Sequence, residues 1–187
     1  MSRAKQLLKE AIDELKKGSI LASQMILEDL YNNFEKYLNQ EDINYDFTLD
    51  NLILLTLGAF LQLKQEIVAK QKFYVSSFLV YDILISNKLT VQNPYFKYIK
   101  AKRYFIFSER IENRIKNLAY NGFLFSGEQK IILLDKGKME SINLLKSIDK
   151  HLSDQIIKIV GEVSYLNSKK ELMRYVEQYL ANLLNRK

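Results

Sequence analysis

The chain has 187 residues, of which 48 % are hydrophobic, and it contains one histidine, one proline and no cysteine. Its length allows one sizeable core or two small lobes, and the lack of cysteine excludes a disulfide, a thiolate nucleophile and a cysteine-ligated zinc site. The formal net charge of +6 at pH 7 favours a polyanionic partner, of which nucleic acid is the simplest.

The N-terminal region is predicted to form an antiparallel pair of helices. Apolar residues recur at helical spacing over residues 4–15 and again over 19–38, and Gly18 between them supplies a left-handed stop. Residues 1–17 are charged throughout and lack the apolar centre of a signal peptide. The two apolar stripes can fill the core of this chain or pair with another subunit.

Two more helices are predicted before residue 93. The first covers residues 49–64 with Asp50 as its N-cap, and its apolar part is too short to span a bilayer. The second begins at Ser76 or Ser77 and ends near Asn87. Acidic residues just before the first of these helices are expected to lie in a solvated loop rather than to bind a metal. We therefore expect a cytoplasmic protein without membrane association.

From Asn93 onward aromatic side chains alternate with basic ones. Cations in such a stretch can hold phosphates while the rings stack on bases. The same alternation is common in a half-buried strand or loop whose rings enter the core, and the two interpretations are compatible on opposite faces. The basic residues concerned are Lys97, Lys100, Lys102 and Arg103.

The helix predicted after Ser108 is the candidate recognition helix, and Asn121 and Gly122 end it. One stripe of this helix offers side chains suited to base edges, because arginine pairs with guanine and asparagine with adenine. That stripe consists of Arg110, Asn113, Arg114 and Asn117. An exposed helix also carries these residue types for solubility alone, and Glu109 and Glu112 would repel phosphates.

A β-hairpin is predicted from Phe123 to Leu134, with Lys130 at its tip. Helices are expected to start at Lys136, at Ser153 and at Ser168, the last with a Ser168–Glu171 capping box. The single histidine, His151, is expected to cap the end of a helix. Between residues 94 and 138 ten basic residues stand against four acidic ones, a difference of +6 that equals the whole net charge.

These elements predict a mainly α-helical protein with one small β-hairpin. An N-terminal helical lobe over residues 1–92 would pack on a C-terminal winged-helix domain over residues 93–187.

From about Phe105 to the C-terminus the chain resembles small prokaryotic winged-helix proteins of the phage-associated and antitoxin-like kind. Members often show Gly-Pro-Tyr-Ser before a helix, a Gly-Leu-Ile step into a hairpin, and Leu-Thr-Glu-Lys-Gly at the start of a long helix. The corresponding segments here are residues 105–108, 122–124 and 133–137. Ser108, Gly122, Lys136 and Gly137 match these motifs, whereas the Gly-Pro pair and the threonine are missing.

The resemblance implies a winged-helix fold and one of two roles. Some such proteins bind DNA as regulators or antitoxins. Others are similar in size and layout to the middle component of three-component bacterial defence systems, which lies between an SMC-like ATPase and a nuclease.

The sequence therefore predicts a non-enzymatic protein that binds duplex DNA. The row on the candidate recognition helix would contact bases, Lys130 would be the wing contact, and residues 97–103 would touch phosphates. No Gly-rich phosphate loop and no Gly-x-Ser-x-Gly nucleophile motif is present, so we expect no cofactor and no small-molecule substrate. The alternative is an interaction subunit that bridges larger partners. A self-sufficient DNA binder is expected to be a homodimer, whereas an interaction subunit is expected to be monomeric or poorly behaved on its own.

Overall fold

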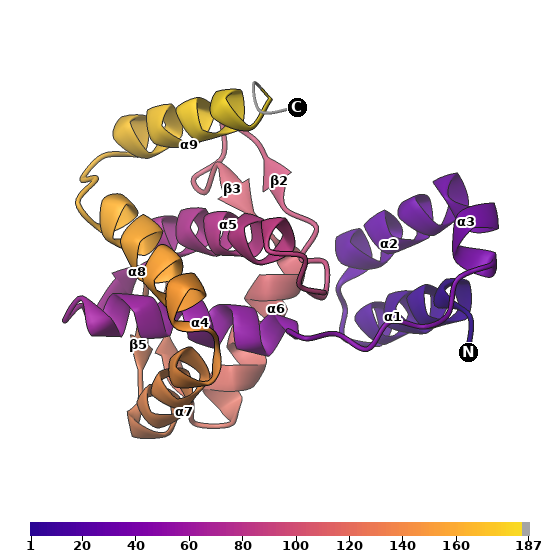
Figure 1. Cartoon of the computed structure of the whole chain (residues 1–187), viewed down its shortest axis with the longest axis horizontal. Helices are drawn as coiled ribbons and strands as arrows, with labels where there is room; N and C mark the ends of the chain where they lie inside the picture. The colour runs from indigo at the N-terminus through magenta and orange to yellow at the C-terminus, as the bar shows by residue number, and fades with distance from the viewer. Residues whose placement is uncertain (185–187) are drawn as a thin grey trace.

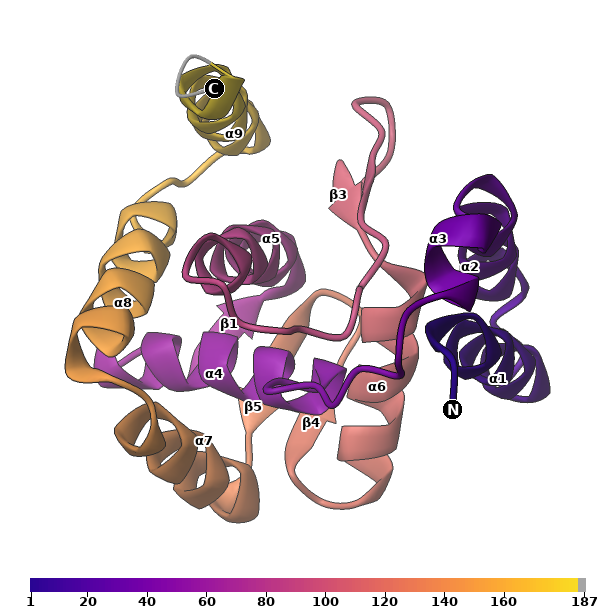
Figure 2. The same cartoon turned by 45° about the vertical axis from the view of Figure 1, so that its right-hand side comes forward.

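A computed structural model describes residues 1–184, and this part of the chain is mainly helical with two small antiparallel sheets (Figures 1 and 2). A hairpin of helices stands to one side, and a larger body contains all the strands (Figure 1). The mainly helical fold class predicted from the sequence is confirmed.

The N-terminal hairpin consists of α1 (Arg3–Lys16), α2 (Ile20–Asn32) and the short α3 (Phe34–Leu38). Ser2 caps α1 by accepting a hydrogen bond from the Lys5 backbone N–H, and Gly18 turns the chain with a φ of +77°. The predicted second helix over 19–38 is divided at Asn33, whose side chain bonds back to Asp29.

The body begins with α4 (Leu49–Gln62), a short strand β1 (Ile67–Ala69) and α5 (Lys70–Ser86). Thr48, not Asp50, is the N-cap of α4. The Thr48 hydroxyl accepts from the Asn51 backbone N–H, and the Asn51 side-chain oxygen accepts from the Thr48 backbone N–H. The predicted start of α5 at Ser76 or Ser77 is wrong. Both serines are buried inside the helix, which begins two turns earlier.

An insert over residues 87–108 follows α5, and it contains the two-stranded pair β2 (Lys97–Tyr98) and β3 (Ile106–Phe107). Next come α6 (Glu109–Tyr120), β4 (Leu124–Ser126) and β5 (Lys130–Leu133). The predicted hairpin over 123–134 is confirmed as β4 and β5. It gains a third strand that the sequence did not indicate, since β1 pairs with β5 to give the order β1–β5–β4.

Three helices complete the body: α7 (Asp135–Ser147), α8 (Lys150–Ser164) and α9 (Lys169–Leu184). The capping box at the start of α9 is confirmed, because Ser168 and Glu171 each accept from the other's backbone N–H. The predicted start of α8 at Ser153 is wrong, since Asp149 caps this helix. His151 therefore lies in a first helical turn and does not cap a helix end.

The hydrophobic side chains divide into two cores of very different size. The larger core runs from Phe47 to Val176 and takes residues from α4 through α9, whereas the smaller one lies within the N-terminal hairpin. The smaller core consists of Ala4, Leu7, Ala11, Ile26 and Leu30. The packing therefore divides near residue 40, and the predicted boundary between 92 and 93 passes through the larger core.

Within the described residues, no helix is long and apolar enough to cross a membrane. The most apolar helix, α4, is instead buried by contacts with α5, α6, α7 and α8.

Candidate nucleic-acid interface

The local sequence fixes the start and the inner face of α6. Ser108 accepts from the Ile111 backbone N–H and donates to the carbonyl of Pro94, which joins the helix start to the insert. Ile111 and Ile115 are fully buried in the larger core. These two isoleucines fix which face of α6 turns inward.

Arg110 does not face solvent. Its side chain is 1 % exposed, and its guanidinium pairs with Glu10 (3.0 Å) and Glu14 (3.1 Å) of α1 and donates to the carbonyl of Asn93 (2.6 Å). The prediction that Arg110 contacts bases is therefore wrong for this structure. The N-terminal hairpin covers the first half of α6, and Arg110 is the ionic anchor between the two cores.

The other three members of the predicted row lie in different surroundings. Asn113 donates to the hydroxyl of Ser19 and is held against the hairpin turn. Arg114 pairs with Asp50 at 3.1 Å and is 28 % exposed, whereas Asn117 is exposed. Only the second half of α6 is free to meet a ligand.

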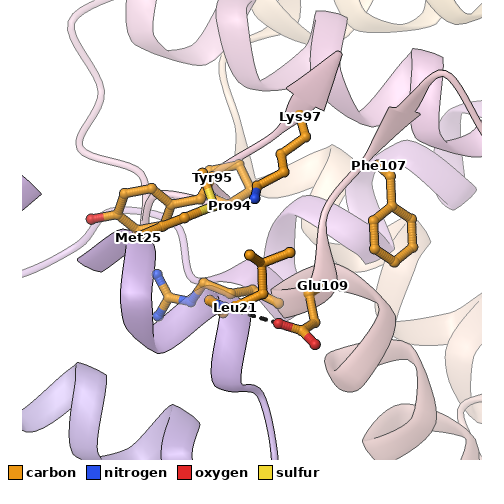
Figure 3. A pocket seen from close by; sticks show the side chains of 9 residues that line it. Leu21, Met25, Pro94, Tyr95, Lys97, Phe107 and Glu109 are labelled. Carbon is orange, nitrogen blue, oxygen red and sulfur yellow. Dashed lines mark hydrogen bonds between the residues drawn. The ribbon is translucent and has the colours of Figure 1, made fainter. Parts of the chain in front are cut away.

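The joint between hairpin and body is tightly packed. Glu109 of α6 accepts from the Ala22 backbone N–H of α2 at 2.8 Å, which is the dashed bond in Figure 3. Leu21, Met25 and Tyr95 surround a cavity of only about 10 Å³ (Figure 3). Such a volume accepts about one water molecule, so it is a packing gap and not a ligand site.

Several basic residues of the 94–138 stretch meet acids from elsewhere in the chain. Lys100 pairs with Glu177 of α9 at 2.6 Å, and Lys138 pairs with Glu66 at 3.0 Å. The hydrogen bond that the Lys100 ammonium donates to the Glu177 carboxylate raises the pKa of this ammonium above its ordinary value. The charge excess counted along the sequence is therefore partly neutralised in space.

Five lysines of that stretch have no acidic partner among the described residues. One of them, Lys136, donates to the Asn121 carbonyl and lies over the Phe123 ring. The other four are Lys97, Lys102, Lys116 and Lys130. They come from the insert, from the second half of α6 and from the β4–β5 hairpin, which is the predicted wing. We call the surface that carries them the basic face.

The insert is in contact with the turn between β4 and β5, and Lys130 follows that turn. Arg103 pairs with Glu128 of the wing turn at 2.8 Å, and the Tyr104 hydroxyl donates to the Glu128 carbonyl at 2.9 Å. Two grooves of about 360 and 660 Å³ share Arg103, Tyr104 and Phe107 as lining residues. Lys97 and Lys102 border the first groove, and Lys116 borders the second.

Acidic side chains are few on this face. Glu112 is committed to Lys70 (2.9 Å) and to the Tyr74 hydroxyl, and Glu128 is committed to Arg103. Lys70, Lys97, Lys102, Arg103, Lys116 and Lys130 are six cations against these two carboxylates, a net charge of +4.

The back of the insert is held by the last helix. Lys169 of α9 donates to the carbonyls of Lys100 and Lys102 at 2.9 and 2.8 Å, and Tyr98 donates to Glu177 at 3.1 Å. The β2–β3 pair is therefore fixed at both ends, by α9 and by the wing. This support holds Lys97 and Lys102 on a rigid element.

Within residues 1–184, no three histidine, cysteine or acidic side chains gather as a metal site would require. The described part of the chain thus offers cations, amides and rings rather than metal ligands.

No family model, curated protein or solved structure matches the chain. The chemistry of the basic face therefore rests on the geometry of this chain alone.

Sequence reasoning missed the carboxylates that neutralise the predicted row. Glu10 and Glu14 lie one helical turn apart on α1, so both can reach one guanidinium. The spacing of these two carboxylates could have indicated that α1 binds a cation. The sequence of α6 does not indicate which helix covers its first half.

Proposed function

We propose that this protein binds nucleic acid, with duplex DNA as the favoured ligand, through the basic face. The observation that carries the proposal is the group of lysines without acidic partners on the insert, the second half of α6 and β5, of which Lys97, Lys102 and Lys116 border two adjoining grooves. Lysines on one face neutralise phosphates and release counterions, which drives sequence-independent binding. The protein acts in this proposal by binding and not by catalysis, and a DNA ligand fits the expected cytoplasmic location.

The topology supports the same proposal. The order α4–β1–α5–α6–β4–β5 with sheet order β1–β5–β4 fits a winged helix in which α6 is the recognition helix and residues 127–129 form the wing turn. The four residues that match the prokaryotic winged-helix motifs all have structural roles. Ser108 caps α6, Gly122 has a φ of +74°, Gly137 approaches the Phe123 carbonyl, and Lys136 lies 4.0 Å from the Phe123 ring centroid.

Because α1 and α2 cover the N-terminal half of α6, this half could not contact a bound duplex. Recognition helices usually contact base edges with their N-terminal residues, and here that half of the helix is packed against α1 and α2. Contact would therefore fall to the insert, the wing and the second half of α6. Such contacts position a duplex but read little sequence, so we propose binding with weak sequence preference.

The test is fluorescence anisotropy with a labelled duplex across a salt series. Four phosphate contacts predict a log–log salt slope of about −3.6. The variant Lys102→Gln/Lys116→Gln/Lys130→Gln should bind at least roughly tenfold more weakly and reduce the slope by about 2.7. Glutamine keeps the length of the side chain and removes only its charge.

A matched control replaces three exposed lysines elsewhere, Lys146, Lys150 and Lys158, with glutamine. This control changes the net charge by the same amount, so its affinity separates a local contact from a general charge effect. Equal loss in both triple variants, or no binding by the wild type at low salt, would remove the proposal.

A second candidate function is the bridging subunit of a larger assembly, such as an SMC-like ATPase complex. The observation in its favour is the apolar surface that the N-terminal hairpin presents to solvent, where Ile20 and Tyr31 are 70 % and 85 % exposed. A protein with this role would fail the duplex-binding test and would copurify with a larger partner.

A further inference from the structure

We propose that the outer face of the N-terminal hairpin is a self-association surface, occupied by the same face of a second copy in a two-fold dimer. The outer face is defined by six apolar side chains, each 40–85 % exposed: Leu8, Ile12 and Leu15 of α1, and Ile20, Leu27 and Tyr31 of α2. The inference is independent of the proposed nucleic-acid binding, which uses residues of the insert, of α6 and of the β4–β5 hairpin.

Helical geometry places these six residues on one side of the hairpin. Residues two apart on a helix point about 200° away from each other. Glu10 and Glu14 of α1 face the body, where they hold Arg110, so Ile12 between them faces away. Asp29 of α2 also faces the body, where it accepts from Tyr95 at 3.1 Å, so Leu27 and Tyr31 face away.

The exposed apolar residues of α1 and those of α2 meet across the hairpin. Leu15 of α1 lines one groove of about 510 Å³ together with Ile20, Leu27 and Tyr31 of α2. The hairpin is thus a two-helix layer with the body on one side and an apolar surface on the other. A second hairpin against that surface would make a four-helix bundle, in which both outer faces become core.

The area of the outer face suits such a dimer. Six side chains of this size, about half exposed, offer on the order of 600 Å², which is as large as the largest apolar patch of a typical monomer. Two copies would bury about 1,200 Å² in total, the lower end of stable specific interfaces. The small core of the hairpin also favours a dimer, because its five buried residues leave much of each helix without apolar contacts.

The charges around the outer face favour a second copy as the partner. The α1 side is bordered by exposed Lys5, Lys9 and Lys16, and the α2 side by exposed Glu28, whose carboxylate accepts only from Gln24 among the described residues. A two-fold arrangement with α1 against α2 of the other copy brings lysines to Glu28, as a self-complementary interface requires. An anionic membrane would be attracted by the α1 border but repelled by Glu28.

The first test is the mass of the full chain in solution, measured by light scattering after size exclusion and by sedimentation over a range of concentrations. We expect a dimer of twice the 22.0 kDa chain. The variant Ile12→Glu/Leu27→Glu should raise the dimer dissociation constant at least 100-fold. Both positions are already partly exposed, so the fold of each chain should survive, as circular dichroism can verify.

Met139→Glu is the matched control, because Met139 is an apolar residue on α7 with 64 % exposure outside the outer face. This variant should remain dimeric. Glu28→Lys should weaken the dimer and Asp154→Lys, an exposed acid on α8, should not. A monomeric wild type, a dimer that survives Ile12→Glu/Leu27→Glu, or a monomer that binds anionic vesicles through this face would each overturn the proposal.

Discussion

At the scale of single residues, Arg110 shows why a residue type alone does not decide between recognition and structure. Arginine suits guanine edges, but it also suits two carboxylates at once because its donors form a rigid fork. Here three bonds, to Glu10, Glu14 and the Asn93 carbonyl, hold the guanidinium inside the protein. The same side chain thus joins the hairpin, the insert and α6.

Replacing Arg110 with alanine should be strongly destabilising. Removal of one partner from a buried ion pair leaves uncompensated charge, here on Glu14 and Glu10, and costs about 3–5 kcal/mol. Arg114→Ala removes a half-exposed pair with Asp50 and should cost no more than about 1 kcal/mol. Urea unfolding of both variants measures the difference.

Equal midpoints for the two arginine variants would contradict the anchoring role of Arg110. The comparison also affects the design of binding experiments. A variant that lacks Arg110 can lose nucleic-acid affinity because the hairpin loosens, so lysines of the basic face are the appropriate positions to change.

At the scale of elements, several caps and turns were predictable because each depends on a few neighbouring residues, although Thr48 and Asp149, not Asp50 and Ser153, cap α4 and α8. Ser108, Gly18 and Gly122 are located as predicted, and so is the β4–β5 hairpin. The start of α5 and the strand β1 were not, because both depend on distant partners. β1 exists by pairing with β5, and Ser76 and Ser77 are polar residues inside a buried helix.

The same distinction applies to the candidate site. The cations of the insert could be selected from sequence because cations between aromatic residues are a local pattern, and Lys130 could be selected from its place in the predicted hairpin. The sequence could not indicate that Arg110, Lys100 and Lys138 are neutralised, because their acidic partners lie between 72 and 100 residues away along the chain. The sequence identifies charge, and the fold decides which charge reaches the surface.

The packing of α7 against the β4–β5 hairpin depends on Gly137. A Cβ atom at this position would lie 2.0 Å from the Phe123 carbonyl oxygen and 2.9 Å from a Leu133 methyl group. Gly137→Ala should therefore force α7 away from the start of β4 and cost about 1–3 kcal/mol. Thermal unfolding measures the loss.

Gly127 in the wing turn is the matched control. A Cβ atom there would be no closer than 3.4 Å to its neighbours, so Gly127→Ala should change the melting temperature little. An equally large loss at Gly127, or none at Gly137, would show that close approach is not what makes position 137 special.

At the scale of the whole molecule, two cores of unequal size are joined by polar contacts. Tyr95 of the insert donates to Asp29 of α2 at 3.1 Å. Tyr45, in the segment that links the hairpin to α4, donates to Glu10 at 2.8 Å and accepts from Arg3 at 2.7 Å. Hydrogen bonds from neutral tyrosines therefore contribute to the joint, beside the Arg110 ion pairs and the packing of Leu21 and Met25. A joint of this kind should respond to alkaline pH.

Burial, followed by the Glu10 carboxylate, raises the pKa of Tyr45 to about 12, and burial beside Asp29 raises the pKa of Tyr95 as well. An unfolded tyrosine titrates near 10.0, so between pH 10 and about 12 the folded joint retains protons that the unfolded chain releases. The stability that these tyrosines contribute is complete below pH 10 and is lost as the pH rises towards 12.

We therefore expect the hairpin to leave the body at alkaline pH before the larger core unfolds. Ionised Tyr45 and Tyr95 would face Glu10 and Asp29 as like charges, whereas the larger core is held mainly by apolar side chains. Small-angle scattering should show an increase in maximum dimension while far-ultraviolet circular dichroism still reports helix. Tyr45→Phe/Tyr95→Phe removes both titrating groups and should move the expansion to the pH at which helix content falls. A single transition in the wild type, with size and helix content changing together, would mean that the two cores unfold as one.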